Sequence, residues 1–191
     1  MDNTITEIST KRMTANPSLY ENQKTNAFQF IVIGLDNVIS PTTGELIPNA
    51  ADIIKDSVTS ADLPSFAQSP LEIRRGNTVM KSAGTPTFSG GAITLNDFVG
   101  LQTYDVLLGW QNLSFNMKTR RNGLMKDYKK DAYLIEYTTD FSNVVRVWRL
   151  EGCWISNLTK TGFNNTNSAD NVAINCTIEF DIAYPDPDAT I

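Results

Sequence analysis

Alternation of apolar and polar residues, the pattern typical of β-strands, dominates the last third of the chain. The stretch VVRVWRLEGCWISNL, which begins at Val144, alternates in its first half, with Trp148 and Leu150 on one face. The opposite face carries Val147, Arg149 and Glu151. We therefore expect a strand that packs on a core with one face and is polar on the other.

The same stretch loses its alternation after Gly152. Cys153, Trp154 and Ile155 follow one another, so the strand becomes apolar on both faces. We expect a neighbouring layer to cover the second apolar face, either the helix of the same chain or an adjacent subunit.

The last strand that the pattern predicts is VAINCTIEFDIAY, which covers residues 172–184. One face of this strand carries Val172, Ile174, Cys176, Ile178, Phe180, Ile182 and Tyr184. The other face carries Ala173, Asn175, Thr177, Glu179, Asp181 and Ala183. The first face would meet a core, and the second would be polar and slightly acidic along its length.

Two further segments read as strands. AFQFIVIGL, residues 27–35, has apolar side chains on both faces, so both faces would be covered. AYLIEYTT places Tyr133, Ile135 and Tyr137 on one face, and DFSN follows it as a turn. This segment should therefore form an antiparallel hairpin with the strand that begins at Val144.

A strand pair, or one long bulged strand, is predicted in PLEIRRGNTVMKSAG. Leu71 and Ile73 would be its inward pair, and Gly76-Asn77 offers a turn or a bulge. The segment TPTFSGGAITLND then gives another strand, with Ile93 and Leu95 facing a core. Gly90-Gly91 is expected to mark a turn.

One helix is predicted, in TYDVLLGWQNLSFNMK. Its apolar stripe is formed by Val106, Leu107, Trp110 and Leu113. Thr103 is expected to cap its N-terminus. The segment between this helix and the strand near residue 131 is basic and contains turn residues: Lys118, Arg120, Arg121, Lys126, Lys129 and Lys130.

The domain organisation follows from these patterns. Residues 1–26 are polar and without periodicity, and we interpret them as an N-terminal arm. Residues 27–191 would form a single domain. Within it, 36–69 has a mixed pattern and is interpreted as an extended loop or insertion that holds one short element.

Composition narrows the function. The chain has 191 residues, 21 acidic against 16 basic side chains, and no histidine. Without histidine, the usual general base and the usual metal ligand are missing. The net charge of −5 argues against a uniformly basic nucleic-acid binder. Phosphate loops and metal-ligand spacings are also missing from the sequence, so we expect a protein that is not an enzyme and has no cofactor or metal.

The roles of several residues allow more than one interpretation. Cys153 and Cys176 are expected to be buried thiols, and they would form a disulfide only if their strands were neighbours with suitable geometry. Glu179 and Asp181 are interpreted as solvent-exposed side chains of a strand. The alternative is that they form the carboxylate pair of a hydrolase. The basic run is read as a solvated loop, as an electrostatic contact between subunits, or as a nucleic-acid contact.

Three segments together resemble the tube proteins of contractile bacteriophage tails: LEIRRGNTVMKSAGTPTFSGGAITLNDFVG, LLGWQNLSFNMKT and DYKKDAYLIEYTTDFSNVVRVWRLEGCWIS. The features that carry the resemblance are a charged strand leading into Lys81–Gly84, a helix with Trp110, and the strand segment Arg146–Trp154. The resemblance covers about residues 27–184. The same fold is similar to the tube proteins of type VI secretion systems and of non-contractile tails.

The resemblance implies a mainly β, α+β fold, an antiparallel β-sandwich or partial barrel with one flanking α-helix. It implies a structural virion protein whose six copies form a ring, with hairpins completing one oligomeric β-barrel. The rings would stack into the inner tube of a tail that is assembled in the host cytoplasm. The tail sheath, baseplate and tail-terminator proteins would be its partners, and genomic DNA would pass through the lumen without specific binding.

Two surfaces are candidates for these roles. The polar strand face, or the strands near 71–81 and 92–97, would line the lumen; the face is formed by Asn175, Thr177, Glu179 and Asp181. Contacts between subunits are expected at Arg146, Arg149, Glu151, Trp154, Arg120, Arg121, Lys129 and Lys130. A baseplate or tail-terminator protein, a type VI-like secretion tube subunit and a carbohydrate-binding β-sandwich remain as alternative functions.

Overall fold

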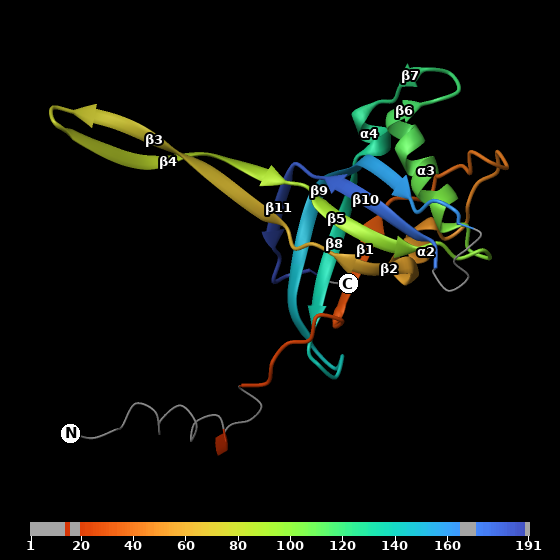
Figure 1. The fold of residues 1–191 in the computed structure, drawn as a ribbon, viewed down its shortest axis with the longest axis horizontal. Coiled ribbons are helices and arrows are strands. Elements are labelled where there is room, and N and C mark those ends of the chain that lie inside the picture. The colour runs from red at the N-terminus through yellow and green to blue at the C-terminus, as the bar shows by residue number, and fades with distance from the viewer. Residues whose placement is uncertain (1–13, 16–19, 165–170, 190–191) are drawn as a thin grey trace.

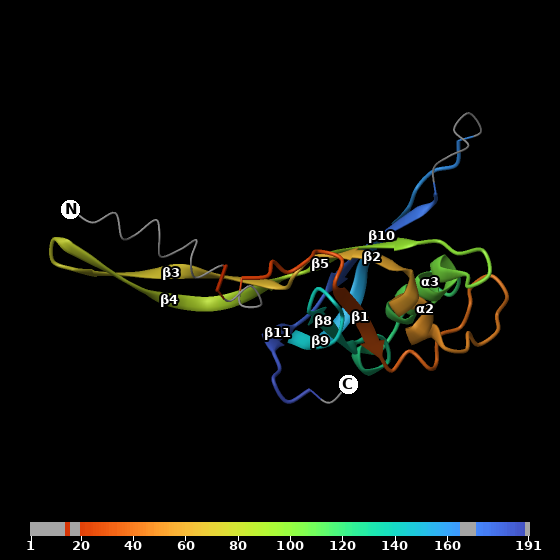
Figure 2. The same ribbon diagram turned by 90° about the horizontal axis from the view of Figure 1, so that it is seen from below.

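The computed structural model describes residues 14–15, 20–164 and 171–189 of the chain. A β-rich body carries one long hairpin that projects from it, as Figure 1 shows. The helices lie at the end of the body opposite the hairpin (Figure 1, Figure 2).

One sheet path joins the strands of the body, in the order β1-β8-β9-β10-β5-β2, with β11 paired to β9. Every pairing is antiparallel. Along this path the strands are β1 (Phe28–Ile33), β8 (Lys130–Tyr137), β9 (Val144–Lys160), β10 (Ala173–Glu179), β5 (Gly91–Asn96), β2 (Val58–Ala61) and β11 (Ile182–Pro185). The first half of β9 pairs with β8 and β11, and its second half pairs with β10.

The central element of the body is therefore β9, which belongs to both halves of the sheet. It changes from one half to the other near Gly152, whose φ of 71° lies in the left-handed region. In the same place β9 has a bulge against β8, because Lys130 pairs with Cys153 whereas Ala132 pairs with Leu150. The extra residue turns both Leu150 and Cys153 toward the core, which explains why alternation ends there.

The apolar run after Gly152 is covered within the chain. Cys153 and Ile155 are buried in the core. Trp154 points the other way and is half-buried, with its ring edge-on to Tyr128 at a centroid distance of 6.1 Å. Tyr128 belongs to the one-turn helix α4 (Met125–Tyr128), so a helical segment of the same chain covers Trp154, but it is not the helix that the sequence predicted.

The C-terminal strand pattern is divided in the structure, contrary to the expectation of one strand. The chain leaves β10 after Glu179, and Asp181 N donates to Glu151 O at 2.9 Å, after which β11 pairs with β9. This crossing between the two halves reverses the facing of the side chains. Ile182 and Tyr184 are exposed and Ala183 is buried, so the inward face inferred from alternation ends at Phe180.

The predicted helix is present as α3 (Thr103–Ser114), which packs against β9. Val106, Leu107 and Trp110 of its apolar stripe are buried, and Leu113 is partly buried against the core. Thr103 is not the N-cap, however. Gln102 occupies that position with φ of 52°, and the buried Thr103 hydroxyl is 3.0 Å from that of Ser57.

The segment 36–69 contributes two elements to the body, helix α2 (Ala50–Ser57) and strand β2. Helix α2 packs against β1 and α3, and Ala50 and Ile54 join the hydrophobic core. The chain before α2 lies close to α3 at Gly109, where a Cβ would stand 2.7 Å from the Ile39 carbonyl oxygen. A glycine in this helix therefore permits a close approach of two segments.

The projecting hairpin consists of β3 (Ser65–Arg75) and β4 (Thr78–Ser89), with Gly76-Asn77 as its two-residue turn. It continues the β2–β5 pair outward from the body, since β2 leads into β3 and β4 leads into β5. Gly90-Gly91 is consequently not a turn but the junction of two collinear strands. A glycine suits position 90 because a Cβ there would lie 2.8 Å from the backbone carbonyl oxygen of Ile178.

The expected fold class is confirmed. The protein is mainly β, with antiparallel sheets and a few short helices. Beyond the helix that the sequence predicts, the structure has α2, α4 and a small hairpin of β6 (Phe115–Asn116) and β7 (Arg121–Asn122). Among the described residues, none of the helices combines the length and the apolar composition needed to cross a bilayer.

Candidate assembly interface

The predicted polar strand face exists on β10. Asn175 is exposed and Thr177 half-exposed, whereas Ile174, Cys176 and Ile178 between and beside them are buried. The neighbouring strands extend this polar surface. Thr94 on β5 donates to Asn175 Oδ1 at 3.2 Å, and Thr159 and Asn157 on β9 are opposite Asn175 and Thr177.

We call this surface the hydroxyl-amide face: Ser60, Thr94, Asn157, Thr159, Asn175 and Thr177. It carries no charge, and its side chains are short. Glu179 lies at one end, where Ser156 Oγ donates to its carboxylate at 3.4 Å. The sheet that bears the face therefore offers water a dense set of neutral hydrogen-bonding groups.

Asp181 does not lie on the hydroxyl-amide face. It follows the end of β10, and both of its carboxylate oxygens accept hydrogen bonds from Lys129 Nζ at 2.7 and 2.8 Å. Its carboxylate also covers Gly152, where a Cβ would overlap it. Asp181 and Lys129 were predicted for two different surfaces, and the structure joins them in one ion pair that supports the crossing from β10 to β11.

The predicted basic run is split by the structure. Arg120 and Arg121 are exposed at the β6–β7 turn, and Arg120 has φ of 57°. Lys129 is engaged by Asp181, and Lys130 is half-buried in β8, with its side chain beside Gly34. Of the four basic residues expected at subunit contacts, Arg120 and Arg121 are thus the exposed ones, and Lys118 and Lys126 of the same run are exposed as well.

Arg149 and Glu151 on β9 belong to a polar cluster on the outer face of the sheet. Arg149 Nη2 is 3.4 Å from Asp131 Oδ2, and Arg149 Nε is 3.2 Å from Glu151 Oε1 in an ion pair without hydrogen-bond geometry. The Tyr184 hydroxyl donates to Glu151 Oε1 at 2.8 Å, and this bond raises the pKa of Tyr184. These groups are partly exposed, so they can meet a partner only as an already paired cluster.

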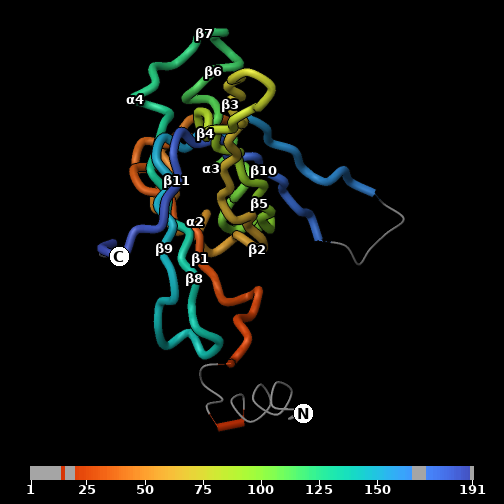
Figure 3. The backbone as a smooth tube through the Cα atoms, turned by 90° about the vertical axis from the view of Figure 1, so that its left-hand side faces the viewer, coloured from red at the N-terminus to blue at the C-terminus, as the bar shows by residue number. Residues whose placement is uncertain are grey.

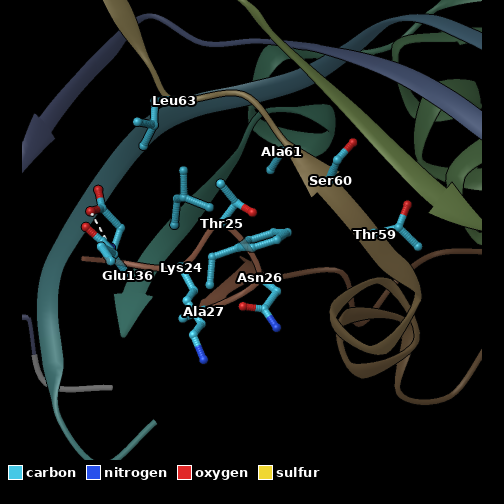
Figure 4. Close-up of a pocket in the computed structure, with 12 residues that line it drawn as sticks. Lys24, Thr25, Asn26, Ala27, Thr59, Ser60, Ala61, Leu63 and Glu136 are labelled. Carbon is cyan, nitrogen blue, oxygen red and sulfur yellow. Dashed lines mark hydrogen bonds between the residues drawn. The ribbon is translucent and has the colours of Figure 1, made fainter. Parts of the chain in front are cut away.

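Arg146 points toward a buried carboxylate. Its Nη1 is 3.5 Å from Glu136 Oε1, and Glu136 is 7% exposed. Glu136 also accepts from Trp148 Nε1 at 2.8 Å and from Gln23 Nε2 at 3.1 Å, the bond drawn in Figure 4. Glu136 is thus fully partnered, as a buried carboxylate must be.

Glu136 lies beside an open seam of the body. Strands β1 and β2 are the two ends of the sheet path, and a cavity of 540 Å³ separates them. Figure 4 shows Ala61 on β2 at one side of this cavity and the segment with Lys24 and Ala27 at the other. The partial barrel is therefore not closed within one chain.

The sequence missed the largest exposed feature, the distal part of the hairpin. Leu71 and Ile73 were predicted to face a core, yet they are 58% and 43% exposed. Met80, opposite Ile73, is 58% exposed on the same face. The reverse face carries Glu72 and Lys81, whose charged groups are 3.7 Å apart. The two side chains share one face, as the alternation indicates, but the prediction that this face meets a core is wrong, because a periodic pattern does not reveal what lies opposite an apolar face.

No catalytic arrangement accompanies these surfaces in the residues that the structure describes. Groups of three or more His, Cys, Asp or Glu side chains that could hold a metal are not found there. Cys153 and Cys176 are both free and buried, and burial raises the pKa of each thiol to about 12. Such thiols stay protonated at neutral pH and are poor nucleophiles.

No protein-family model and no curated protein matches the sequence. Solved structures do match the fold. One match is a chain in the structure of the PVC sheath/tube terminator, part of an extracellular contractile injection system, in the extended state. That chain is 18% identical to this protein, with TM-score 0.58. The match covers 87% of this chain and 97% of that one. A chain of the PVC sheath-tube complex is also 18% identical, with TM-score 0.59 and coverage of 91% and 97%.

The cap that terminates the tube of the anti-feeding prophage gives a similar result. Its chain is 18% identical, with TM-score 0.58, and the match covers 87% of this chain and 91% of that one. At this identity the comparison establishes the fold. The protein therefore has the tail-tube fold, found in tube and tube-terminator structures of contractile injection systems, and the resemblance seen in its sequence holds at that level.

Proposed function

We propose that this protein is a structural subunit of a bacteriophage tail tube, and that six copies form a ring that stacks with further rings around a DNA channel. In this proposal the protein performs no catalysis and binds no cofactor. It is assembled in the host cytoplasm and ends in the virion tail. A contractile sheath surrounds the tube, with the baseplate and a tail-terminator protein at its two ends.

The observation that carries the proposal is the projecting hairpin. All of β3 is exposed, including Leu71 and Ile73, and Figure 2 shows the ribbon extending away from the body. Apolar surface left in water costs about 25 cal/mol per Å². An isolated two-stranded ribbon is also marginally stable in water. A hairpin of this length is therefore best explained by contacts with other subunits.

The edges of the sheet support ring formation. In the described structure, β2 pairs only with β5, and the second half of β9 pairs only with β10. The four strands that bear the hydroxyl-amide face thus have an unpaired backbone edge at each side. Pairing such edges between neighbours closes a barrel and removes the aggregation hazard of open edges.

The hydroxyl-amide face is the proposed lumen wall. Lysine and arginine would bind phosphates and hold the DNA, because each such contact releases counterions. Asn175, Thr177 and their neighbours carry no positive charge, and Glu179 adds a negative one. A duplex could therefore slide along the wall without specific binding.

A tube terminator is the second candidate, because the fold also matches the PVC terminator and the anti-feeding prophage cap. A terminator would form one ring at the end of a tube instead of polymerising. The carbohydrate-binding alternative receives little support, since Trp110 is buried and Trp148 and Trp154 are half-buried against other side chains.

Electron microscopy of the purified protein tests the proposal. Hollow tubes with six-fold cross-sections are expected at high concentration. Single rings that do not elongate, together with one ring per particle, would favour the terminator. A monomer that stays monodisperse at high concentration would refute both assembly roles.

A further inference from the structure

The base of the hairpin forms one wall of an apolar groove. Phe66 and Phe88 pack on each other at a centroid distance of 5.9 Å, and Phe88 rests on Phe180 of the body. The opposite wall is formed by Trp148 and by the short strand β11. The groove has a volume of 620 Å³. In Figure 3, which looks at the molecule from the side of the hairpin tip, the β11 segment is seen next to the ribbon.

The tip of the hairpin carries an apolar surface of matching chemistry. Leu71, Ile73 and Met80 share one face of the ribbon, because Ile73 pairs with Met80 and Leu71 is two residues away. This tip face cannot reach the groove of its own chain, since the ribbon extends away from the body (Figure 1). Phe66 and Leu71 also leave β3 on opposite faces, because their positions differ by an odd number.

The charges beside the two surfaces are complementary. Arg75 pairs with Thr78 on the tip face, next to Ile73. Asp186 directly follows the groove-lining Pro185, and its backbone is fixed by a hydrogen bond from its N–H to Val147 O at 2.8 Å. Within the described chain, neither Arg75 nor Asp186 forms an ion pair.

We propose that the groove binds the hairpin tip of a second copy of this chain. Leu71, Ile73 and Met80 of one copy pack against Phe66 and Tyr184 of the next, and Arg75 meets Asp186 at the rim. Each copy then donates one tip and accepts another, a head-to-tail contact that either closes into a ring or continues along a stack. The inference rests on the proposed function only for the number of copies and for the tube that results.

The test uses one variant of each surface in the full-length protein. Met80→Asp places a charge on the tip face and leaves the groove intact, whereas Phe66→Asp places a charge in the groove and leaves the tip intact. Val79→Asp is the control for the tip, because Val79 is 50% exposed on the opposite face of the same strand. Phe163→Asp is the control for the groove, because Phe163 is exposed at a distant loop.

Sedimentation velocity gives the readout, with circular dichroism as a check on folding. Met80→Asp alone and Phe66→Asp alone are expected to remain monomeric at concentrations at which the wild-type protein and both controls assemble. An equal mixture of the two defective variants is expected to form a 1:1 dimer and no larger species, because one intact tip and one intact groove remain. A mixture that stays monomeric, or a Val79→Asp variant as defective as Met80→Asp, would overturn the inference.

The outcomes separate this inference from the proposed function. If the wild-type protein forms tip-to-groove dimers or open chains but no hollow tubes, the tube proposal fails and the inference stands. If tubes form in spite of both Asp substitutions, the inference fails and the tube proposal stands.

Discussion

The body and the hairpin have similar sequence patterns but very different surroundings. Both contain strands with alternating apolar residues, such as Ile174 and Ile178 in β10 and Leu71 and Ile73 in β3. The first pair is almost completely buried, whereas the second pair is about half exposed. The difference shows that the body folds on its own core, whereas the apolar face of the hairpin is left uncovered by the chain.

Substitutions in the body are therefore expected to lower the free energy of unfolding of the monomer. Substitutions in the hairpin are expected to reduce the extent of assembly. The predictions below test these two expectations in order of their expected effect on the free energy of unfolding of the monomer.

Truncation of Trp110 should have the largest effect. Trp110 is 1% exposed, and its Nε1 donates to Tyr128 O at 2.8 Å. Trp110→Ala should lower the free energy of unfolding by about 3–5 kcal/mol, measured by urea denaturation with far-UV circular dichroism. Phe66→Ala in the hairpin is the matched control and should cost much less. Equal losses for the two variants would contradict the distinction between body and hairpin.

Gly109→Ala should be destabilising although alanine is the better helix former. The new Cβ would stand 2.7 Å from both Ile39 O and Val38 Cγ1, and a backbone oxygen cannot move cheaply. We expect a loss of about 1–3 kcal/mol in urea unfolding. Asn112→Ala, on a less enclosed side of the same helix, should be close to neutral. A stabilised Gly109→Ala variant would show that the approach of the two segments is looser.

Alkaline pH should destabilise the body through its thiols. The pKa of Cys153 and of Cys176 is about 12 in the folded protein and close to 9 in the unfolded chain. Above pH 9 the unfolded state therefore loses protons that the folded state keeps, and stability falls as pH rises. At pH 10 the loss should be about 1 kcal/mol per thiol. Urea midpoints between pH 8 and 10 should fall less steeply in a Cys153→Ala, Cys176→Ala variant.

The ion pair between Lys129 and Asp181 should contribute little. Its side chains are partly exposed, so Asp181→Asn should cost less than about 1 kcal/mol, and added salt should reduce the difference from wild type. Thermal melts at low and high salt measure this. A large, salt-insensitive loss would indicate that Asp181 fixes the crossing from β10 to β11 by its geometry near Gly152.

Shortening the hairpin should have the smallest effect on the monomer and a complete effect on assembly. Joining Ala67 to Thr87, which are paired, through an Asn-Gly turn removes the tip and keeps the base. The free energy of unfolding should change by no more than about 0.5 kcal/mol, while rings and tubes disappear from electron micrographs. Tubes formed by this variant would contradict the assembly role of the hairpin.

Much of the fold could be predicted from the sequence, because the signals involved are local. The β8–β9 hairpin follows from two alternating runs around DFSN, and α3 follows from the spacing of Val106 and Trp110. The alternation of β10 also correctly placed Asn175 and Thr177 on an open polar face. These features depend only on neighbours in the chain.

Other features could not be predicted. The reversal of side chains after Phe180 depends on a crossing between two halves of the sheet, and the sequence continues to alternate through it. Lys129 and Asp181 form one pair although 52 residues separate them, and no local signal indicates that contact. The position of Thr103 inside α3 depended on Ser57, which packs against it from another helix.

The sequence by itself determined where most of the long strands lie, where the β8–β9 hairpin turns, and which neighbouring side chains of one strand share a face, because these properties follow from backbone geometry and residue periodicity. Only the tertiary structure decided what lies opposite each face: a core for β10, water for β3, and a groove between β11 and the base of the ribbon. Burial depends on atoms brought from distant parts of the chain, or from another copy of it, and alternation along one strand contains no information about them.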